Sequence, residues 1–163
     1  MSVRISVFGP YYPRRNLERL IKLRDGLVEA GFRDTELVRD RPDPPGPPPT
    51  AEGKSFYYLE RSDFNVMFFP RFGDKSGVSI EVRHVLGLGP EIKRSTLLIA
   101  EIRLGEHDPL AVLTSLLRDA PEFSKLRVAK VLQRDDKLVL NAARSFVERR
   151  LIEDGRYSEL LGG

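Results

Sequence analysis

The chain has 163 residues, of which 40% are hydrophobic and 31% charged, and its formal net charge at pH 7 is +3. That length suits a single domain, residues 1–163, with a sizeable core, and the composition is normal for a globular protein. The absence of cysteine excludes disulfides, zinc–thiolate sites and a cysteine nucleophile. With only His84 and His107 as imidazoles, a histidine-rich metal centre is also disfavoured, so we expect no metal and no cofactor.

Charge and hydropathy also limit the partners. The net charge is small, and the only basic pairs that stand out are Arg14-Arg15 and Arg149-Arg150, which argues against a nucleic-acid partner. No apolar stretch approaches the roughly 20 residues of a membrane span. The opening residues, MSVRISVFGP, lack the apolar core and cleavage site of a signal peptide. We therefore expect a cytoplasmic protein that makes no membrane contact.

The first third of the chain alternates between strand and helix patterns. A short apolar run predicts a strand over residues 3–8, with both faces buried because the run does not alternate. Asn16 can cap the helix that follows, and Gly31 stands where a C-terminal glycine belongs. A second strand is predicted over residues 35–40. Residues 41–50, RPDPPGPPPT, then form a stiff proline-rich surface loop, because proline lacks a donor and fixes φ.

The middle of the chain repeats this alternation. Thr50 can cap a helix that extends to residue 62, and the apolar stretch 64–69 predicts the central strand. Residues 70–77 form a loop, and the apolar stripe in residues 78–88 predicts a helix.

The last third continues in the same order. A strand is predicted over residues 96–104, and Asp108 before Pro109 marks a helix start that leads to residue 118. The final strand covers residues 126–132, and the closing helix begins at Asp135 or Asp136. This order predicts an α/β three-layer sandwich: a five-stranded parallel sheet in the flavodoxin-like order 2-1-3-4-5 with helices on both faces.

In such sheets, ligands bind beyond the carboxyl ends of the strands, where the strand order reverses. For this order, the rule selects the loops after the first and third strands, residues 9–15 and 70–77. The sequence therefore predicts a small-molecule site between these two loops.

The first of these loops reads GPYYPRR. Gly9 would let a ligand approach the backbone, while Tyr11 and Tyr12 offer flat faces and hydroxyls for a base or a sugar. Arg14 lies at a helix N-terminus, where a phosphate is favoured. A plain turn with solvated arginines remains the alternative. The loop is neither a Walker sequence nor a G-x-G-x-x-G fingerprint, which argues against a nucleoside triphosphate hydrolase.

The second loop reads PRFGDKSG. Arg71 is a candidate phosphate partner, and Asp74, Ser76 and Gly77 are candidate ligand contacts. Ser76 can cap the next helix or bind an anion beside it.

Glu81 is placed in the first turn of the helix after this loop, at the edge of its inward face. Two interpretations stay open: a carboxylate that stabilises the helix dipole, or one placed for chemistry. His84 is expected on the outer, solvated side of the same helix, and His107 in a loop. Neither histidine has a visible Ser or Asp partner, so a nucleophilic triad is not supported.

The stretch SDFNVMFFPRFGDKSGVSIEVRHVLG resembles the nucleoside 2-deoxyribosyltransferase superfamily, which includes the deoxynucleoside monophosphate N-glycosidases. That family shows "AD", an apolar strand, a loop, and then G-x-x-x-E on a helix. Here Ser62-Asp63, Gly77 and Glu81 fall in register, and Gly9 matches the glycine of the first loop. Toll/interleukin-receptor-type NAD hydrolases share this layout and a helix-borne glutamate, and archaeal proteins with a "GP" first loop and a "GVxIE" helix start are also similar.

The resemblance implies a fold, a reaction and a set of residues. Glu81 would be the nucleophile that attacks the anomeric carbon of a nucleoside, nucleotide or NAD-like substrate, forming a glycosyl-enzyme. The family's acidic partner falls at Ser55, so Glu52, one turn earlier, is the acidic substitute. The family's strand tyrosine falls near Ser6, and Tyr11 or Tyr12 would replace it. The family often builds its sites from two subunits, which implies a homodimer.

Two further hypotheses stay open beside this enzyme. The same fold could be a non-catalytic nucleotide-binding or sensing domain, since the aspartate is missing and Arg14, Arg15 and Arg71 could hold a phosphate. It could also be an interaction module with an incidental pocket, because architecture alone does not define function.

Overall fold

The computed structural model of the chain describes residues 3–108, 112–113, 115–156 and 158. Its five strands form one parallel sheet in the order β2-β1-β3-β4-β5, which confirms the predicted topology. The strands are β1 (Arg4–Phe8), β2 (Asp34–Leu37), β3 (Phe64–Phe69), β4 (Thr96–Ile102) and β5 (Arg127–Leu132).

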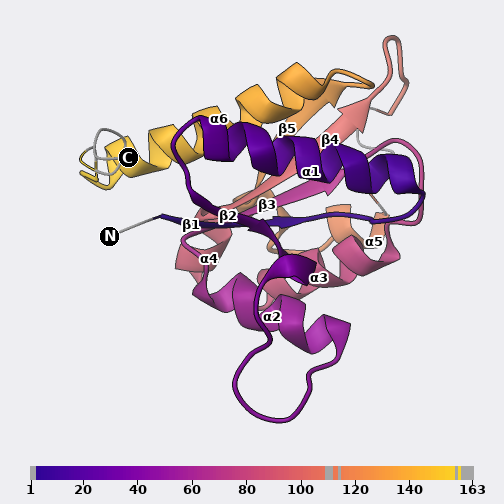
Figure 1. The fold of residues 1–163 in the computed structure, drawn as a ribbon. Helices are drawn as coiled ribbons and strands as arrows, with labels where there is room; N and C mark the ends of the chain where they lie inside the picture. The colour runs from indigo at the N-terminus through magenta and orange to yellow at the C-terminus, as the bar shows by residue number, and fades with distance from the viewer. Residues whose placement is uncertain (1–2, 109–111, 114, 157, 159–163) are drawn as a thin grey trace.

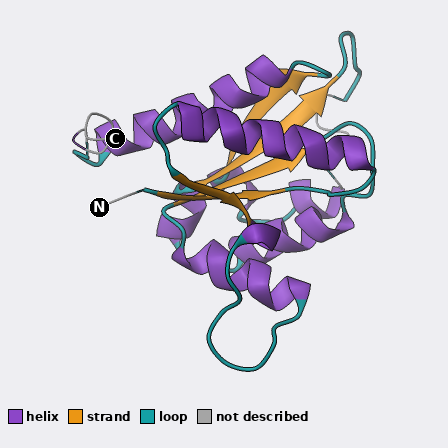
Figure 2. Cartoon of the chain, in the orientation of Figure 1, coloured by secondary structure: helices purple, strands orange, loops and turns teal. Residues whose placement is uncertain are grey.

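The helices cover both faces of this sheet (Figures 1 and 2). Two long helices, α1 (Arg14–Glu29) and α6 (Asp136–Glu153), pack on one face. The other face carries α2 (Ala51–Arg61), α3 (Ser76–Leu86), α4 (Pro90–Arg94) and α5 (Ser115–Arg118). Parallel strands require such crossover helices, and right-handed crossovers place them on the two faces in this way.

Two apolar cores result, one on each side of the sheet. Every residue of β3 is buried, as expected for a central strand, and its side chains alternate between the cores. Val66 and Phe68 belong to the core under α1 and α6, whereas Met67 and Phe69 belong to the core under α2 and α3. The alternation follows from the two-residue period of a strand.

Several predicted boundaries were wrong. The second strand ends at Leu37, and a 3₁₀ turn, η1 (Val38–Asp40), replaces its last three residues. The fourth strand ends at Ile102. Two short elements were missed: α4, and a 3₁₀ turn, η2 (Phe123–Lys125). Of the helix predicted from Asp108, the last turn is α5, while its predicted start at Pro109 lies outside the described residues.

The helix starts beside the site also differ from prediction. Helix α1 begins at Arg14, with Pro13 at the N-cap and no side-chain cap, so Asn16 does not cap it. Helix α3 begins at Ser76, so Glu81 is its sixth residue and lies beyond the first turn. A stabilising interaction with the helix dipole weakens beyond the first turn, which makes that interpretation of Glu81 less suitable.

The proline-rich loop, residues 41–50, is fixed at both ends. Arg41 is buried, and its guanidinium binds Asp34 Oδ1 (2.6 Å), Ser6 Oγ (3.0 Å) and the Ile5 carbonyl (2.7 Å). At the other end, the Thr50 hydroxyl accepts a hydrogen bond from Gly53 N and caps α2, as predicted. In the part of the chain that the structure describes, no helix is long and apolar enough to span a membrane.

Candidate functional site

The loops after β1 and β3 meet beside the start of α2, where they enclose a pocket of about 470 Å³. The switch-point rule predicted this location from the strand order. The residues that line the pocket come from both loops and from α2 and α3: Gly9, Pro10, Tyr11, Tyr12, Ala51, Glu52, Ser55, Asp74, Ser76, Gly77, Val78, Ile80 and Glu81.

Asn16 joins the two loops. Its side-chain amide donates to the carbonyl of Tyr12 (3.2 Å) in the first loop and to that of Phe72 (2.9 Å) in the second. At Gly73, where φ is +106°, an added Cβ would lie 2.4 Å from the Asn16 amide and 2.9 Å from the Tyr12 carbonyl, so only glycine allows this approach. Asn16 therefore positions the pocket rather than capping a helix, a role that sequence periodicity does not reveal.

Glu81 is half-buried as a residue, but its carboxylate oxygen Oε2 is covered and has no hydrogen-bond partner among the described residues. The side chain forms no ion pair with Arg14 or Arg83. Arg14 instead pairs with Glu18 (3.2 Å). Removal from water disfavours the charged form, and this burial raises the pKa of Glu81 to about 8. An unpartnered carboxyl of this kind is costly, which makes it a candidate functional group.

Tyr11 lies near this carboxyl. Burial raises the pKa of the Tyr11 phenol to about 12, and the negative charge of Glu81 adds to the increase, while a backbone hydrogen bond from Arg39 opposes it. The Arg39 guanidinium lies 5.3 Å from the centre of the Tyr11 ring. The phenol thus stays protonated at neutral pH, when it can donate a hydrogen bond but is a weak acid.

Other predicted polar residues line the same pocket. Glu52 is exposed in the first turn of α2, and the half-buried Ser55 follows it, so both face the same pocket as Glu81. Asp74 Oδ1 accepts from the Ser76 backbone (2.9 Å), which lowers the pKa of Asp74. Ser76 was a predicted cap, but the N-cap position is Lys75, and no side chain caps α3 there.

The two predicted glycines differ in their surroundings. At Gly9, a Cβ would lie 2.8 Å from Leu20 Cδ2 and 3.2 Å from the Phe68 carbonyl, so close packing of α1 explains this glycine. At Gly77, nothing lies within 4 Å of an added Cβ, and the residue lines the pocket. Only Gly77 therefore leaves open space that a ligand could use.

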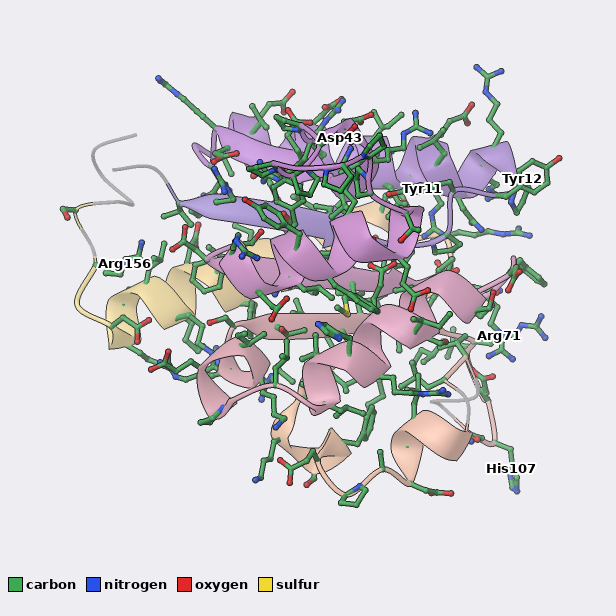
Figure 3. The ribbon with its side chains drawn as sticks, turned by 90° about the horizontal axis from the view of Figure 1, so that it is seen from below. Tyr11, Tyr12, Asp43, Arg71, His107 and Arg156 are labelled. Atoms are coloured by element: carbon green, nitrogen blue, oxygen red, sulfur yellow. The ribbon has the colours of Figure 1, made fainter. Side chains whose placement is uncertain are left out.

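The predicted phosphate partners lie outside the pocket. Arg14 has an 88% exposed side chain that pairs with Glu18, and Arg71 forms an ion pair with Glu106. Neither arginine lines the pocket. Tyr12 does line it, but is 82% exposed, and Figure 3 shows it projecting outward while Tyr11 lies over the body of the protein.

A buried acidic centre was missed at the same end of the sheet. Glu101, near the end of β4, is 2% exposed. It binds the Arg19 guanidinium through both oxygens (3.1 and 2.6 Å), and accepts from the backbones of Arg71 (2.8 Å) and Arg134 (2.9 Å). These partners hold its pKa below the usual range despite burial. With all of its acceptors in use, Glu101 is a structural residue, in contrast with Glu81.

The histidines have different environments. The prediction that His84 lies on the solvated side of α3 was wrong. Its ring stacks on Phe56 of α2, with centroids 3.8 Å apart and planes 6° apart. This contact holds α3, which carries Glu81, against α2, which carries Glu52. His107 is exposed, and Figure 3 shows it at the margin of the protein, so the predicted loop position is confirmed. Within the described part of the chain, no three His, Asp or Glu side chains group as metal ligands.

Comparisons with known proteins define the fold alone. No protein-family model and no curated sequence matches the chain. The structure is similar to oxidised flavodoxin 1 from Bacillus cereus, with a TM-score of 0.50 and 12% identity over 90% of this chain and 98% of the flavodoxin. It is also similar to the diflavin flavoprotein A3 from Nostoc sp., with a TM-score of 0.51 and 10% identity over 94% and 99% of the two chains. The chain thus has a flavodoxin-like α/β fold.

Proposed function

We propose that the protein cleaves or transfers an N-glycosidic bond of a nucleoside-like small molecule through Glu81. The observation that supports this most is a covered carboxylate without a partner, in a pocket formed by the two switch-point loops. The family resemblance assigns the nucleophile's role to the same residue. The buried Glu101 has both oxygens hydrogen-bonded, whereas Oε2 of Glu81 has no partner among the described residues.

In this proposal, the ionised Glu81 attacks the anomeric carbon and the bond to the base nitrogen breaks, with its electron pair going to the nitrogen. The resulting glycosyl ester is then attacked by water, or by a second base in a transfer reaction, which restores the carboxylate. Tyr11, which remains protonated, would donate a hydrogen bond to the sugar or the carboxyl. Glu52, which lines the same pocket, is the acidic residue that the resemblance suggests for a proton transfer to the leaving base.

The protonation of Glu81 sets the pH dependence of this reaction. With a pKa of about 8 in the free protein, the nucleophilic form is a minor species at neutral pH. We expect kcat/KM to rise tenfold per pH unit below about 8 and to level off above it. A pH profile of base release checks this, and a flat profile from pH 6 to 9 would contradict a nucleophilic Glu81.

A flavin mononucleotide is a further candidate ligand, because the two similar structures are flavoproteins. Phosphates bind at a helix N-terminus through backbone N–H groups and cations. Here the loop before α1 contains Pro10 and Pro13, which lack N–H groups, and no lysine, arginine or histidine is among the described residues that line the pocket. The residues present do not fit a phosphorylated flavin, so no step is derived through one.

The test is release of free base from a panel of nucleosides, nucleotides and NAD, followed by chromatography. We expect release by the wild type, loss of at least 10³-fold in Glu81→Gln, and little change in Glu29→Gln, an exposed glutamate at the end of α1. Gly77→Leu, which fills open space in the pocket, should raise KM. Release that persists in Glu81→Gln would exclude the nucleophile.

The non-catalytic binding domain is the second candidate. It is favoured by Ser55, where the resemblance expects an aspartate. Its signature is different: no base is released, but a nucleoside raises the melting temperature, and Gly77→Leu abolishes that increase.

A further inference from the structure

The charge of the pocket bears on what it can bind. Its lining contains three carboxyl groups, Glu52, Asp74 and Glu81, and none of the described residues that line it is a lysine, arginine or histidine. The carboxyls come from three different elements and converge on one volume of about 470 Å³. In addition, Oε2 of Glu81 is covered and without a partner inside it.

Nearby cations are held by other groups. Arg71 forms an ion pair with Glu106, and the Lys75 ammonium donates to the carbonyls of Gly73 (3.0 Å) and Arg71 (3.4 Å). Arg39 lies over the ring of Tyr11 and is 3.4 Å from Asp40. Among the described residues, Glu52 and Asp74 are therefore the lining groups that carry charge when Glu81 is protonated, and both repel a phosphate and attract a cation.

We propose that the pocket selects an unphosphorylated N-glycoside whose base carries a positive charge, of the N-ribosylpyridinium class. This rests on the proposed function and names its substrate class. A phosphate on the sugar would face Glu52 and Asp74 without a cation to receive it. A cationic base would instead supply the positive charge that is missing beside these carboxyl groups.

The reaction chemistry agrees with this selection. A pyridinium base leaves as a neutral pyridine: Glu81 forms its bond to the anomeric carbon, and the electron pair of the broken C–N bond neutralises the ring nitrogen. No proton has to be delivered to the leaving group, so the missing acid at Ser55 is no obstacle. Water then attacks the glycosyl ester, its proton leaves to solvent, and free ribose and the carboxylate are formed.

The first test measures binding in Glu81→Gln, which keeps the shape of the acid but cannot attack. The probes are nicotinamide riboside, its reduced and uncharged form, and nicotinamide riboside 5′-phosphate, compared by calorimetry. We expect the cationic riboside to bind about tenfold more tightly than either of the others at 0.1 M salt. Equal binding of the uncharged form, or tighter binding of the phosphate, would overturn the proposal.

A second set of variants tests the carboxyls themselves. Adding Glu52→Gln and Asp74→Asn should bring the ratio of cationic to uncharged binding to within about twofold of unity. Adding Glu29→Gln, which removes one charge far from the pocket, should leave the ratio unchanged. A ratio that survives the loss of both pocket carboxyls would refute the charge selection.

The two proposals can fail separately. If the wild type releases base from neutral nucleosides but not from nicotinamide riboside, the charge selection fails and the proposed function stands. If no N-glycoside is cleaved, the proposed function fails, while the binding ratios still decide whether the pocket prefers a cation.

Discussion

The fold covers one carboxylate oxygen of Glu81, Oε2, without giving it a hydrogen-bond partner among the described residues. Such groups usually stay protonated, because the charged form has lost its hydration. Burial is the cause of the raised pKa of Glu81, and the pocket residues Glu52 and Asp74 bring no positive charge to offset it. A covered carboxyl without a partner lowers the stability of the fold when it is ionised.

We expect Glu81→Gln to stabilise the protein in a pH-dependent way. The folded-state pKa of Glu81 is raised from 4.5 to about 8, so the wild type loses stability as pH rises through this window. Since the glutamine does not titrate, the variant should match the wild type near pH 4.5 and exceed it by about 1–3 kcal/mol at pH 8, allowing for partial exposure. Urea denaturation of both proteins measures this, and a difference that does not change with pH would contradict the burial of an unpaired acid.

At the scale of elements, the pocket depends on two loops held together by one side chain. Asn16→Ala removes the hydrogen bonds to the carbonyls of Tyr12 and Phe72. We expect a loss of about 1–3 kcal/mol in the free energy of unfolding, because two carbonyls lose their donor at a buried position. Asn141→Ala, at an exposed site in the middle of α6, is the matched control and should cost nothing. Equal urea midpoints for the two variants would show that Asn16 does not join the loops.

The inner strands were predictable because β1, β3 and β4 are short, largely apolar runs between loop signals. The alternation with helices predicted a parallel sheet, and 2-1-3-4-5 was chosen as a natural order for five such strands. The predicted helix boundaries were less accurate, because several neighbouring loop residues could each begin a helix. Asp74 binds the Ser76 backbone, and α3 begins at Ser76, two residues before its predicted start. Gly89-Pro90 begins α4, whose five residues are too few to show helical periodicity.

The site was predictable in part, for a similar reason. The switch-point rule depends on topology alone, and the loop residues that it selected, such as Tyr11 and Asp74, do line one pocket. Glu52 was expected there from the family resemblance, and it lines the same pocket. The prediction that Arg14 and Arg71 bind a phosphate was less successful, because it depended on which carboxylates lie near these arginines. Glu18 and Glu106 receive these arginines, and a contact such as Arg71 with Glu106, between residues far apart in sequence, cannot be read from local pattern.

At the scale of the whole molecule, Glu101 ties together the carboxyl end of the sheet. Its oxygens connect α1 through Arg19, the loop after β3 through Arg71, and the loop after β5 through Arg134. Arg19 also binds Asp136 (2.9 Å) at the start of α6, so both helices of that face are included. Because these are buried and charged groups, the network should respond strongly to the loss of one member.

We expect Glu101→Gln to lower the free energy of unfolding at pH 7 by about 2–4 kcal/mol, since Arg19 loses a buried partner. The pKa of Glu101 is lowered in the folded state, so its contribution is present above the unfolded value and is lost as pH falls below it. The variant should therefore approach the wild type in acid. Glu148→Gln, which breaks an exposed pair with Arg144, should cost at most about 0.5 kcal/mol. Similar losses for the two variants would contradict a special role for Glu101.

The proline-rich loop is fixed near its two ends. Arg41 is buried at one end, the Tyr58 hydroxyl donates to the Pro42 carbonyl (2.5 Å), and Thr50 caps α2 at the other. Its middle, near Gly46, lies in solvent (Figure 1). Extra chain inserted at that point would add only a small closure entropy and would leave the anchors in place. The loop is therefore where an affinity tag, a fluorescent label or a whole guest domain could be grafted while α2 still presents Glu52 to the pocket.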